Sequence, residues 1–286
     1  MNDFAFHAPT SLKEAADLLA QYDGEGKIMS GGTALILLLK QSLVQPDHLI
    51  SLHRVPEARG IEVKDGVLHI GGLVTQREAE QSAVVREATP LLANAYSRVA
   101  TVRIRNAATV GGGLAQADPA QDPPASLLVL NASVKVMSAT GEREIAIADW
   151  FTDYYETSIA EDEIVTELLV PVQPKDLGWT YIKYLPRTED DYATVSVAAL
   201  GRVEGGKIAD VRIGLGAVAP TALRATVVED ALRGKEATPQ ALRDAAQAVA
   251  DIVDPTSDPR GSADYKRDMS VVFTRRALEQ VLGVTP

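Results

Sequence analysis

The sequence contains no cysteine. This absence excludes disulfide bonds, thiolate nucleophiles and cysteine-ligated iron–sulfur clusters within the chain. A chain of this composition that takes part in electron transfer must therefore bind an organic cofactor or depend on a partner chain. The absence of cysteine also fits a cytoplasmic protein, because disulfides are rare in reducing compartments.

A long apolar segment is also missing. The longest apolar run, Ala34 to Leu39, is far shorter than the roughly 20 residues that a membrane-spanning helix needs. The N-terminal residues Met1-Asn2-Asp3-Phe4 lack the basic segment and the apolar stretch of a secretory signal. We therefore expect a cytoplasmic protein without membrane insertion.

Positive charge is scarce, since 28 lysines and arginines face 39 aspartates and glutamates and the formal net charge is −11. A surface this acidic repels phosphate backbones, so nucleic acid is not expected as a partner. With 46% hydrophobic and 23% charged residues, the composition is that of an ordinary globular protein. The length of 286 residues favours two packed units over a single core.

Signatures of metal binding and hydrolysis are absent as well. The four histidines, His7, His48, His53 and His69, do not have the spacing that places two ligands on one helix face. The chain has neither a G-x-S-x-G nucleophile elbow nor a Walker A loop. We therefore assign no metal ligand and no catalytic side chain.

The first 56 residues alternate between helix and strand patterns. Ser11 to Glu14 is typical of a capping box before an amphipathic helix. Strands are predicted at 27–29 and 47–52, with a helix at 34–41 between them. This alternation predicts an α/β unit.

The rest of the chain has a different pattern. Asp65-Gly66 predicts a β-hairpin, and Pro171 to Gly178 is typical of a linker. Between them we expect helices beginning near Thr75, Thr89 and Asp122, and strands near 133–137, 142–147 and 163–170. After the linker we expect three antiparallel strands and then helices; the strands are 180–185, 193–203 and 207–217, and the last helix is 262–282.

Two glycine motifs are candidates for binding an anion. In Lys27 to Leu35 a strand ends, Gly31 and Gly32 turn the chain, and a helix begins, so that free amides can hold a phosphate. In Thr109 to Ala115 three consecutive glycines are predicted to expose a row of amides that suits a pyrophosphate. The alternatives are a plain strand–helix turn for the first motif and a flexible loop for the second.

An acidic segment, Asp118 to Pro124, follows the second glycine motif. A carboxylate in this segment can accept hydrogen bonds from a ribose hydroxyl or an adenine amine. The alternative for Asp122 is that it caps the next helix. Further on, Gly214 to Ala219 matches the dinucleotide pattern G-x-G-x-x-A, but that pattern requires a βαβ unit and these residues lie in a predicted antiparallel sheet.

In their order and separation these motifs resemble the FAD-binding medium subunit of the xanthine dehydrogenase family, which includes bacterial carbon monoxide dehydrogenase and related molybdenum hydroxylases. The resemblance covers nearly the whole chain. Besides the two glycine motifs it includes Phe6-His7-Ala8-Pro9, Ala117-Asp118-Pro119, Arg187-Thr188-Glu189-Asp190-Asp191-Tyr192-Ala193 and Gly261-Ser262-Ala263-Asp264-Tyr265-Lys266.

The resemblance implies an α+β protein with two domains. Residues 1–176 would form a two-part FAD-binding domain of the PCMH type, as in the vanillyl-alcohol oxidase-like flavoproteins, with subdomains at about 1–56 and 57–176. Residues 177–286 would form an α+β domain with a three-stranded antiparallel sheet and helices.

The resemblance also implies which residues bind the cofactor. Two segments would wrap the FAD pyrophosphate: Lys27, Ile28, Met29, Ser30, Gly31, Gly32, Thr33, Ala34 and Leu35 in the first, and Thr109, Val110, Gly111, Gly112 and Gly113 in the second. Asp122, or its neighbour Asp118, matches the acidic residue of the nucleotide-binding segment. Lys183 would lie near the flavin, and Tyr192 would lie against the isoalloxazine ring and govern access by an acceptor.

The chain departs from the family pattern at two positions. Gly113 stands where relatives often have asparagine, which removes one possible hydrogen bond to the cofactor, and Gln116 stands where many have histidine. The chain also lacks the cysteine-bearing insertion that gives one branch, the hydroxybenzoyl-CoA reductases, an extra cluster.

By resemblance, the chain would be the flavin-carrying electron-transfer subunit of a complex. A large subunit would carry a molybdopterin cofactor, and a small subunit would carry [2Fe-2S] centres, in a dimer of heterotrimers. Neither the substrate nor the final electron acceptor can be inferred from this chain. The alternatives are a stand-alone flavin oxidoreductase, a scaffold subunit without FAD, and a nicotinamide enzyme that uses the Gly214 motif.

Overall fold

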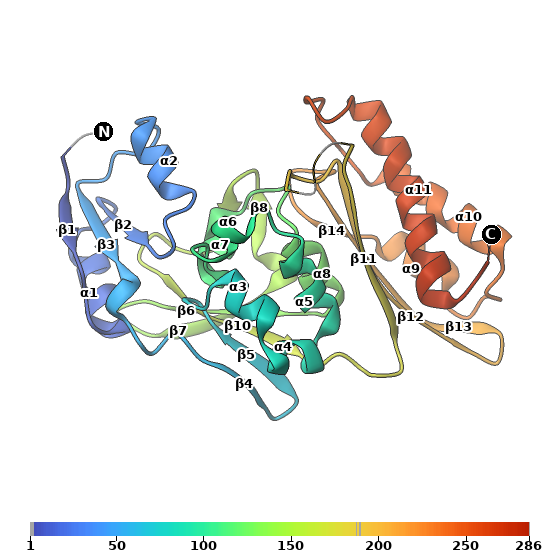
Figure 1. The fold of residues 1–286 in the computed structure, drawn as a ribbon, viewed down its shortest axis with the longest axis horizontal. Coiled ribbons are helices and arrows are strands. Elements are labelled where there is room, and N and C mark those ends of the chain that lie inside the picture. The colour runs from blue at the N-terminus through green and yellow to red at the C-terminus, as the bar shows by residue number, and fades with distance from the viewer. Residues whose placement is uncertain (1–2, 187, 189, 286) are drawn as a thin grey trace.

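Three parallel strands form the first sheet of the computed structural model, which describes residues 3–186, 188 and 190–285. Met1, Asn2, Arg187, Glu189 and Pro286 belong to predicted segments but lie outside the described residues. The sheet has the order β1-β3-β2, with bounds Ala5–His7, His48–Ser51 and Gly26–Met29. The helices α1 (Leu12–Gln21) and α2 (Leu35–Lys40) connect its strands (Figure 1).

The first helix has only part of the predicted capping box. Ser11 accepts a hydrogen bond from the amide of Glu14, as expected for an N-cap. The Glu14 carboxylate instead accepts hydrogen bonds from the amide and hydroxyl of Thr10. Ala15, Ala16 and Leu19 bury one face of α1 in a core with Ile50, which fixes the helix on the sheet.

The second sheet is antiparallel and has five strands in the order β4-β5-β10-β6-β7. The predicted hairpin joins its first two strands, with positive φ at both Asp65 and Gly66, as a type I′ turn requires. The strands are β4 (Ile61–Lys64), β5 (Val67–Gly71), β6 (Ser133–Met137), β7 (Glu142–Ala146) and β10 (Ile164–Pro171), with a small β8–β9 ribbon at Phe151–Asp153 and Glu156–Thr157. The helices of this part are α3 (Gln76–Gln81), α4 (Ala83–Ala88), α5 (Pro90–Ser97), α6 (Val102–Arg105), α7 (Val110–Gln116) and α8 (Pro123–Val129).

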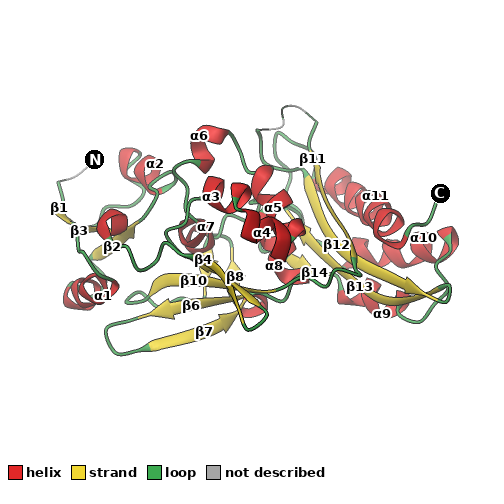
Figure 2. Cartoon of the chain, turned by 60° about the horizontal axis from the view of Figure 1, so that its bottom comes forward, coloured by secondary structure: helices red, strands yellow, loops and turns green. Residues whose placement is uncertain are grey.

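The C-terminal sheet has the order β11-β12-β13-β14, and the helices that follow it in the sequence lie on one of its faces (Figure 2). Its strands are β11 (Gly178–Tyr184), β12 (Val195–Glu204), β13 (Lys207–Gly216) and β14 (Leu223–Arg224). The predicted sheet had three strands, and β14 adds a fourth of two residues because Arg224 and Leu223 pair with Gly214 and Leu215. The helices are α9 (Thr226–Leu232), α10 (Pro239–Gln247) and α11 (Ala263–Leu282). Short 3-10 helices lie at Leu52–Arg54, Ile147–Asp149 and Ala248–Asp251.

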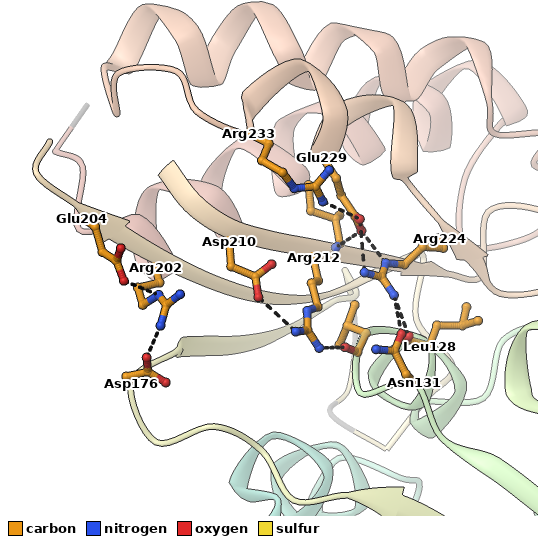
Figure 3. Close-up of polar contacts among 12 residues, drawn as sticks. Leu128, Asn131, Asp176, Arg202, Glu204, Asp210, Arg212, Arg224, Glu229 and Arg233 are labelled. Atoms are coloured by element: carbon orange, nitrogen blue, oxygen red, sulfur yellow. Dashed lines mark hydrogen bonds and ion pairs between the residues drawn. The ribbon is translucent and has the colours of Figure 1, made fainter. Parts of the chain in front are cut away.

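Helix α8 connects the second sheet to the C-terminal sheet. Its buried residues belong to one core with strand residues of the second sheet and with Tyr181, Ala198 and Leu200 of the C-terminal sheet. Figure 3 shows Arg224 reaching the carbonyl of Leu128 and the side chain of Asn131 at the end of this helix, at 3.0 Å each. The N-terminal and C-terminal parts therefore pack against each other, and the predicted α+β fold is confirmed. No described helix is both long and apolar enough to cross a membrane.

Candidate cofactor site

The two glycine motifs meet in space. The Oγ of Ser30 lies 2.8 Å from the Oγ1 of Thr109, across 79 residues of sequence. A Cβ on Gly112 would lie 2.7 Å from both of these hydroxyl oxygens, and a Cβ on Gly31 would lie 2.0 Å from the carbonyl oxygen of Ala107. These distances are shorter than any side chain tolerates, so glycine allows the turns to approach this closely.

The first turn leaves a row of backbone amides unpaired. Within the described residues, no acceptor receives a hydrogen bond from the amides of residues 31–35. Gly32 has φ +71, a left-handed conformation that side chains disfavour. Successive amides around such a turn form a concavity that suits an anion. A plain strand–helix turn also leaves amides unpaired at the start of its helix, so that alternative stays open.

The second motif differs from the prediction of an exposed amide row. It is not a flexible loop, because Val110, Gly111, Gly112 and Gly113 begin helix α7. Their amides are paired within the protein, with the carbonyls of Val74, Gly72 and Thr109 and with the Thr109 hydroxyl as acceptors. The expectation of free amides at Gly111 to Gly113 is therefore wrong. The glycines serve close packing instead, since a Cβ on Gly111 would lie 2.8 Å from the Gly72 carbonyl oxygen.

The other residues of the first motif support the turn from β2. Lys27 is exposed, whereas Ile28 packs against the first core. Met29, Thr33, Ala34 and Leu35 are partly buried around the turn. The structure therefore brings Ser30 and Gly31 of the first segment next to the second segment, whereas unpaired amides occur only in the first.

Asp122 and Lys183 form a buried ion pair. Their side chains are each 4% exposed, and Lys183 Nζ lies 3.0 Å from Asp122 Oδ2. Tyr181 donates a hydrogen bond of 2.6 Å to Asp122 Oδ1, and Lys183 also donates to the carbonyl of Arg98 at 2.8 Å. Burial raises the pKa of Asp122 above its usual value, although Lys183 and Tyr181 act in the opposite direction. Asp122 stands before α8 but makes no side-chain capping bond, so the capping alternative is wrong.

Asp118 lies in a second group with two tyrosines. Its Oδ1 accepts a hydrogen bond from the amide of Ala120 at 2.9 Å, and Tyr155 donates to its Oδ2 at 3.3 Å. Tyr192 is 46% exposed, and burial of its hydroxyl together with the charge of Asp118 raises its pKa well above the usual range. Asp118 and Tyr192 thus share one region, which sequence spacing did not indicate.

The G-x-G-x-x-A match is part of the C-terminal sheet. Gly214 and Gly216 lie in β13, which pairs with β12 in the antiparallel direction. A Cβ on Gly214 would lie 2.2 Å from the carbonyl oxygen of Ala125 in α8, and one on Gly216 would lie 2.5 Å from Ser196 Oγ. These glycines allow a helix to pack closely on a sheet, and the βαβ context of a dinucleotide fingerprint is missing.

The histidines do not form a metal site in the part of the chain that the structure describes. His7 Nε2 lies 3.1 Å from His48 Nδ1, and Tyr22 stacks on His48 with 3.6 Å between ring centres. No group of three or more histidine, aspartate or glutamate side chains among the described residues has the geometry to hold a metal ion.

Sequence reasoning missed several residues of the region. Gln76 and Gln121 flank Gly113, Tyr181 and Tyr155 bind the two aspartates, and Arg260 lies over Tyr192. The capping box from Thr75 to Glu78 predicts the helix that carries Gln76, but nothing local indicates that it pairs with the glycine segment through Thr75 and Thr109.

Comparison with known proteins gives matches along most of the chain. Residues 2–173 match the family described as FAD binding domain in molybdopterin dehydrogenase. Residues 180–281 match the family described as CO dehydrogenase flavoprotein C-terminal domain.

Individual relatives match over nearly their full length. The carbon monoxide dehydrogenase medium chain of Hydrogenophaga pseudoflava is 36% identical over 96% of each chain. The nicotine 6-hydroxylase medium subunit of Paenarthrobacter nicotinovorans is 34% identical over 96% of this chain and 95% of the relative. A chain of the solved carbon monoxide dehydrogenase of Hydrogenophaga pseudoflava superposes with a TM-score of 0.94 at 38% identity, over 98% of this chain and 97% of that one.

Proposed function

Because the chain belongs to the family of FAD-binding medium subunits of the molybdenum hydroxylases, we propose that it is the electron-transfer subunit of such a complex. In this proposal electrons arrive from the iron–sulfur centres of a small partner subunit and leave to an external acceptor. Substrate is oxidised at a molybdopterin cofactor on a large partner subunit. The observation that carries the proposal is the contact of Ser30 with Thr109, which joins the two glycine segments beside a row of unpaired amides.

We propose that the amides of residues 31–35 hold the FAD diphosphate. Unpaired N–H groups in a left-handed turn match the charge and hydrogen-bonding capacity of phosphate oxygens. Gly112 keeps this surface free of a side chain, and Ser30 and Thr109 line its edge with hydroxyls. The residues present therefore fit the cofactor that the family implies.

The buried ion pair supplies further candidate contacts. Lys183 uses two of its three N–H donors on Asp122 and Arg98, which leaves one donor for the cofactor. Each Asp122 oxygen accepts one hydrogen bond from the protein and retains a second lone pair. We propose that both residues bind the cofactor, and that Asp118 and Tyr192 lie on the side from which the acceptor approaches.

In this proposal the protein contributes to the reaction by positioning the FAD. FAD supplies the exchange between one-electron and two-electron transfer. The chain binds the diphosphate, holds a lysine charge in place and covers the site with Tyr192. No side chain is required to transfer a proton, which agrees with the absence of an assigned catalytic residue.

The test compares FAD content in two glycine variants of the full chain. Gly112→Glu places a bulky anion between Ser30 and Thr109, and Gly141→Glu is a matched control because a Cβ on Gly141 meets nothing within 4 Å. We expect stoichiometric FAD in the unchanged chain and in the control, and loss of most FAD from Gly112→Glu. Circular dichroism verifies folding. Full FAD occupancy in folded Gly112→Glu would contradict the proposal.

The same preparation separates the alternatives. Flavin reduction by an oxidisable substrate without any other chain favours a stand-alone oxidoreductase. A folded chain that takes up no FAD favours a scaffold subunit. Co-purification with a large molybdenum-containing chain and a small iron–sulfur chain, at the mass of a dimer of heterotrimers, supports the proposed complex, which we propose to be cytoplasmic.

The domain boundary near residue 176 is also part of the proposal. It falls between β10, which ends at Pro171, and β11, which begins at Gly178. The subdomain boundary near residue 56 falls between β3 and β4. Limited proteolysis that cuts between 172 and 177 and yields two stable fragments supports the first boundary.

A further inference from the structure

Two glutamine amides converge on Gly113. A Cβ on Gly113 would lie 3.1 Å from Gln76 Nε2 and 3.5 Å from Gln121 Oε1. Gln76 begins helix α3 and is 6% exposed, whereas Gln121 lies in the loop before α8. Two segments 45 positions apart thus place their amides around a position that has no side chain.

Each of these amides has a buried polar atom without a partner. Gln76 Oε1 and Gln121 Nε2 are shielded from solvent and make no hydrogen bond among the described residues. Buried polar atoms are almost always hydrogen-bonded in native proteins, because leaving one unpaired carries its full desolvation cost. The other atom of each amide, Gln76 Nε2 and Gln121 Oε1, lies next to Gly113 and also has no hydrogen-bond partner among the described residues, so both amides are open to a ligand or a water on that side.

The pair presents one acceptor and one donor. Next to Gly113 these are Gln76 Nε2 as the donor and Gln121 Oε1 as the acceptor, and a half turn of both amides exchanges the two roles. A phosphate oxygen only accepts hydrogen bonds and cannot satisfy the acceptor. A hydroxyl group both donates and accepts, so it satisfies the pair.

We propose that Gln76 and Gln121 bind a hydroxyl of the ribitol chain of FAD beside Gly113. This inference rests on the proposed function, because it requires FAD at the site. Gly113 is part of the arrangement, since any side chain at this position would occupy the space between the two amides. The glutamines are binding residues that act on the affinity for the cofactor and not on its reactivity.

The test uses Gln76→Leu and Gln121→Leu in the full chain after removal of FAD. Leucine approximates the volume of glutamine but has no amide. We expect each variant to bind FAD about tenfold more weakly, as loss of one hydrogen bond predicts. We also expect equal or higher thermal stability of the FAD-free chain, because an unpaired buried amide is removed. A purely structural glutamine would instead lower the stability and leave the FAD affinity unchanged, which would overturn the inference.

Gln173→Leu is the matched control. Gln173 is 5% exposed, and its Oε1 accepts a hydrogen bond from the amide of Leu91, so the protein itself satisfies it. We expect this variant to lower the stability of the FAD-free chain without changing its affinity for FAD.

ADP tests the ribitol assignment, because it contains the diphosphate but no ribitol. We expect the two variants to bind ADP as the unchanged chain does, and an equal loss for ADP and FAD would overturn the assignment to ribitol. If the unchanged chain binds no FAD, the proposed function itself is wrong. If the unchanged chain binds FAD and both variants bind it equally well, only the inference about the glutamines is wrong.

Discussion

The guanidinium carbon of Arg260 lies 5.3 Å from the centre of the Tyr192 ring, within the range of a cation–π contact. Arg260 also forms ion pairs with Asp191 at 3.2 Å and with Asp258 at 3.1 Å. Arg260 belongs to the loop before α11, and Tyr192 to the segment before β12. This contact therefore holds the exposed tyrosine from a distant part of the chain.

Tyr192→Ala is expected to raise the rate at which oxygen reoxidises the reduced protein several-fold, with little change in FAD content. The reason is that, in the proposed function, Tyr192 lies on the side from which the acceptor approaches and does not line the diphosphate turn. Stopped-flow reoxidation and FAD quantification measure the two effects. Trp179→Ala is the control, because Trp179 is also a partly exposed aromatic residue. It lies near the start of β11, whereas Tyr192 follows the end of that strand. Unchanged reoxidation of Tyr192→Ala would remove the shielding role.

Arg260→Gln is expected to change the reoxidation rate in the same direction as Tyr192→Ala, but less. The variant loses the ion pairs and the cation–π contact that hold the ring, while the ring itself remains. Arg233→Gln is a suitable control, since Arg233 forms a surface ion pair with Asp230 at 2.8 Å on helix α9. A rate equal to that of the control would show that Arg260 does not position Tyr192.

The pH dependence of stability is expected to reflect Asp258. Burial raises the pKa of its carboxyl, but the hydrogen bonds from Lys266 and Arg260 and the charge of Lys266 outweigh this and lower the pKa below its usual value. Since the pKa in the folded state is depressed, the stabilisation is present above the unfolded-state pKa and is lost as the pH falls through the folded-state value. We expect Asp258→Asn to melt below the unchanged chain at neutral pH, and the difference to vanish in acid. A difference that is constant with pH would exclude this ionisation as its cause.

The Asp122–Lys183 pair is expected to show strong coupling in a double-mutant cycle. Removing either partner leaves the other charge buried, which typically costs about 3–5 kcal/mol. We expect Asp122→Leu and Lys183→Met each to lower the free energy of unfolding substantially, and the double variant to be more stable than the sum of the two effects predicts. Chemical denaturation of the FAD-free chain measures this. Additive effects would contradict a mutual ion pair.

Gly214→Ala is expected to destabilise the chain without affecting FAD binding by its folded fraction. The added Cβ meets the Ala125 carbonyl oxygen at 2.2 Å, so α8 must move away from β13. Overpacking of this kind typically costs about 1–3 kcal/mol. Gly60→Ala serves as the control, because a Cβ on Gly60 meets nothing within 4 Å and its backbone is not in the left-handed region. Loss of FAD from a fully folded Gly214→Ala chain would support the interpretation of Gly214 to Ala219 as a nucleotide-binding motif.

Local sequence patterns predicted much of the fold. The capping residues Ser11 and Thr75, the Asp65-Gly66 turn and the prolines that start helices act through neighbours only a few residues away, so their effects could be predicted without the tertiary structure. The short strand β14 was missed because two residues carry no periodicity and pair only where β13 is already in place.

The sequence by itself determined the order of the elements, the two glycine segments and the exclusion of any cysteine-bound cluster. The tertiary structure alone decided which amides are free: those of residues 31–35 have no partner among the described residues, whereas distant carbonyls at Val74 and Gly72 pair with those of Val110 and Gly111. It also decided that Asp122 meets Lys183 across 61 residues and does not cap its own helix. The physical reason is that hydrogen-bond partners and burial depend on segments that only folding brings together.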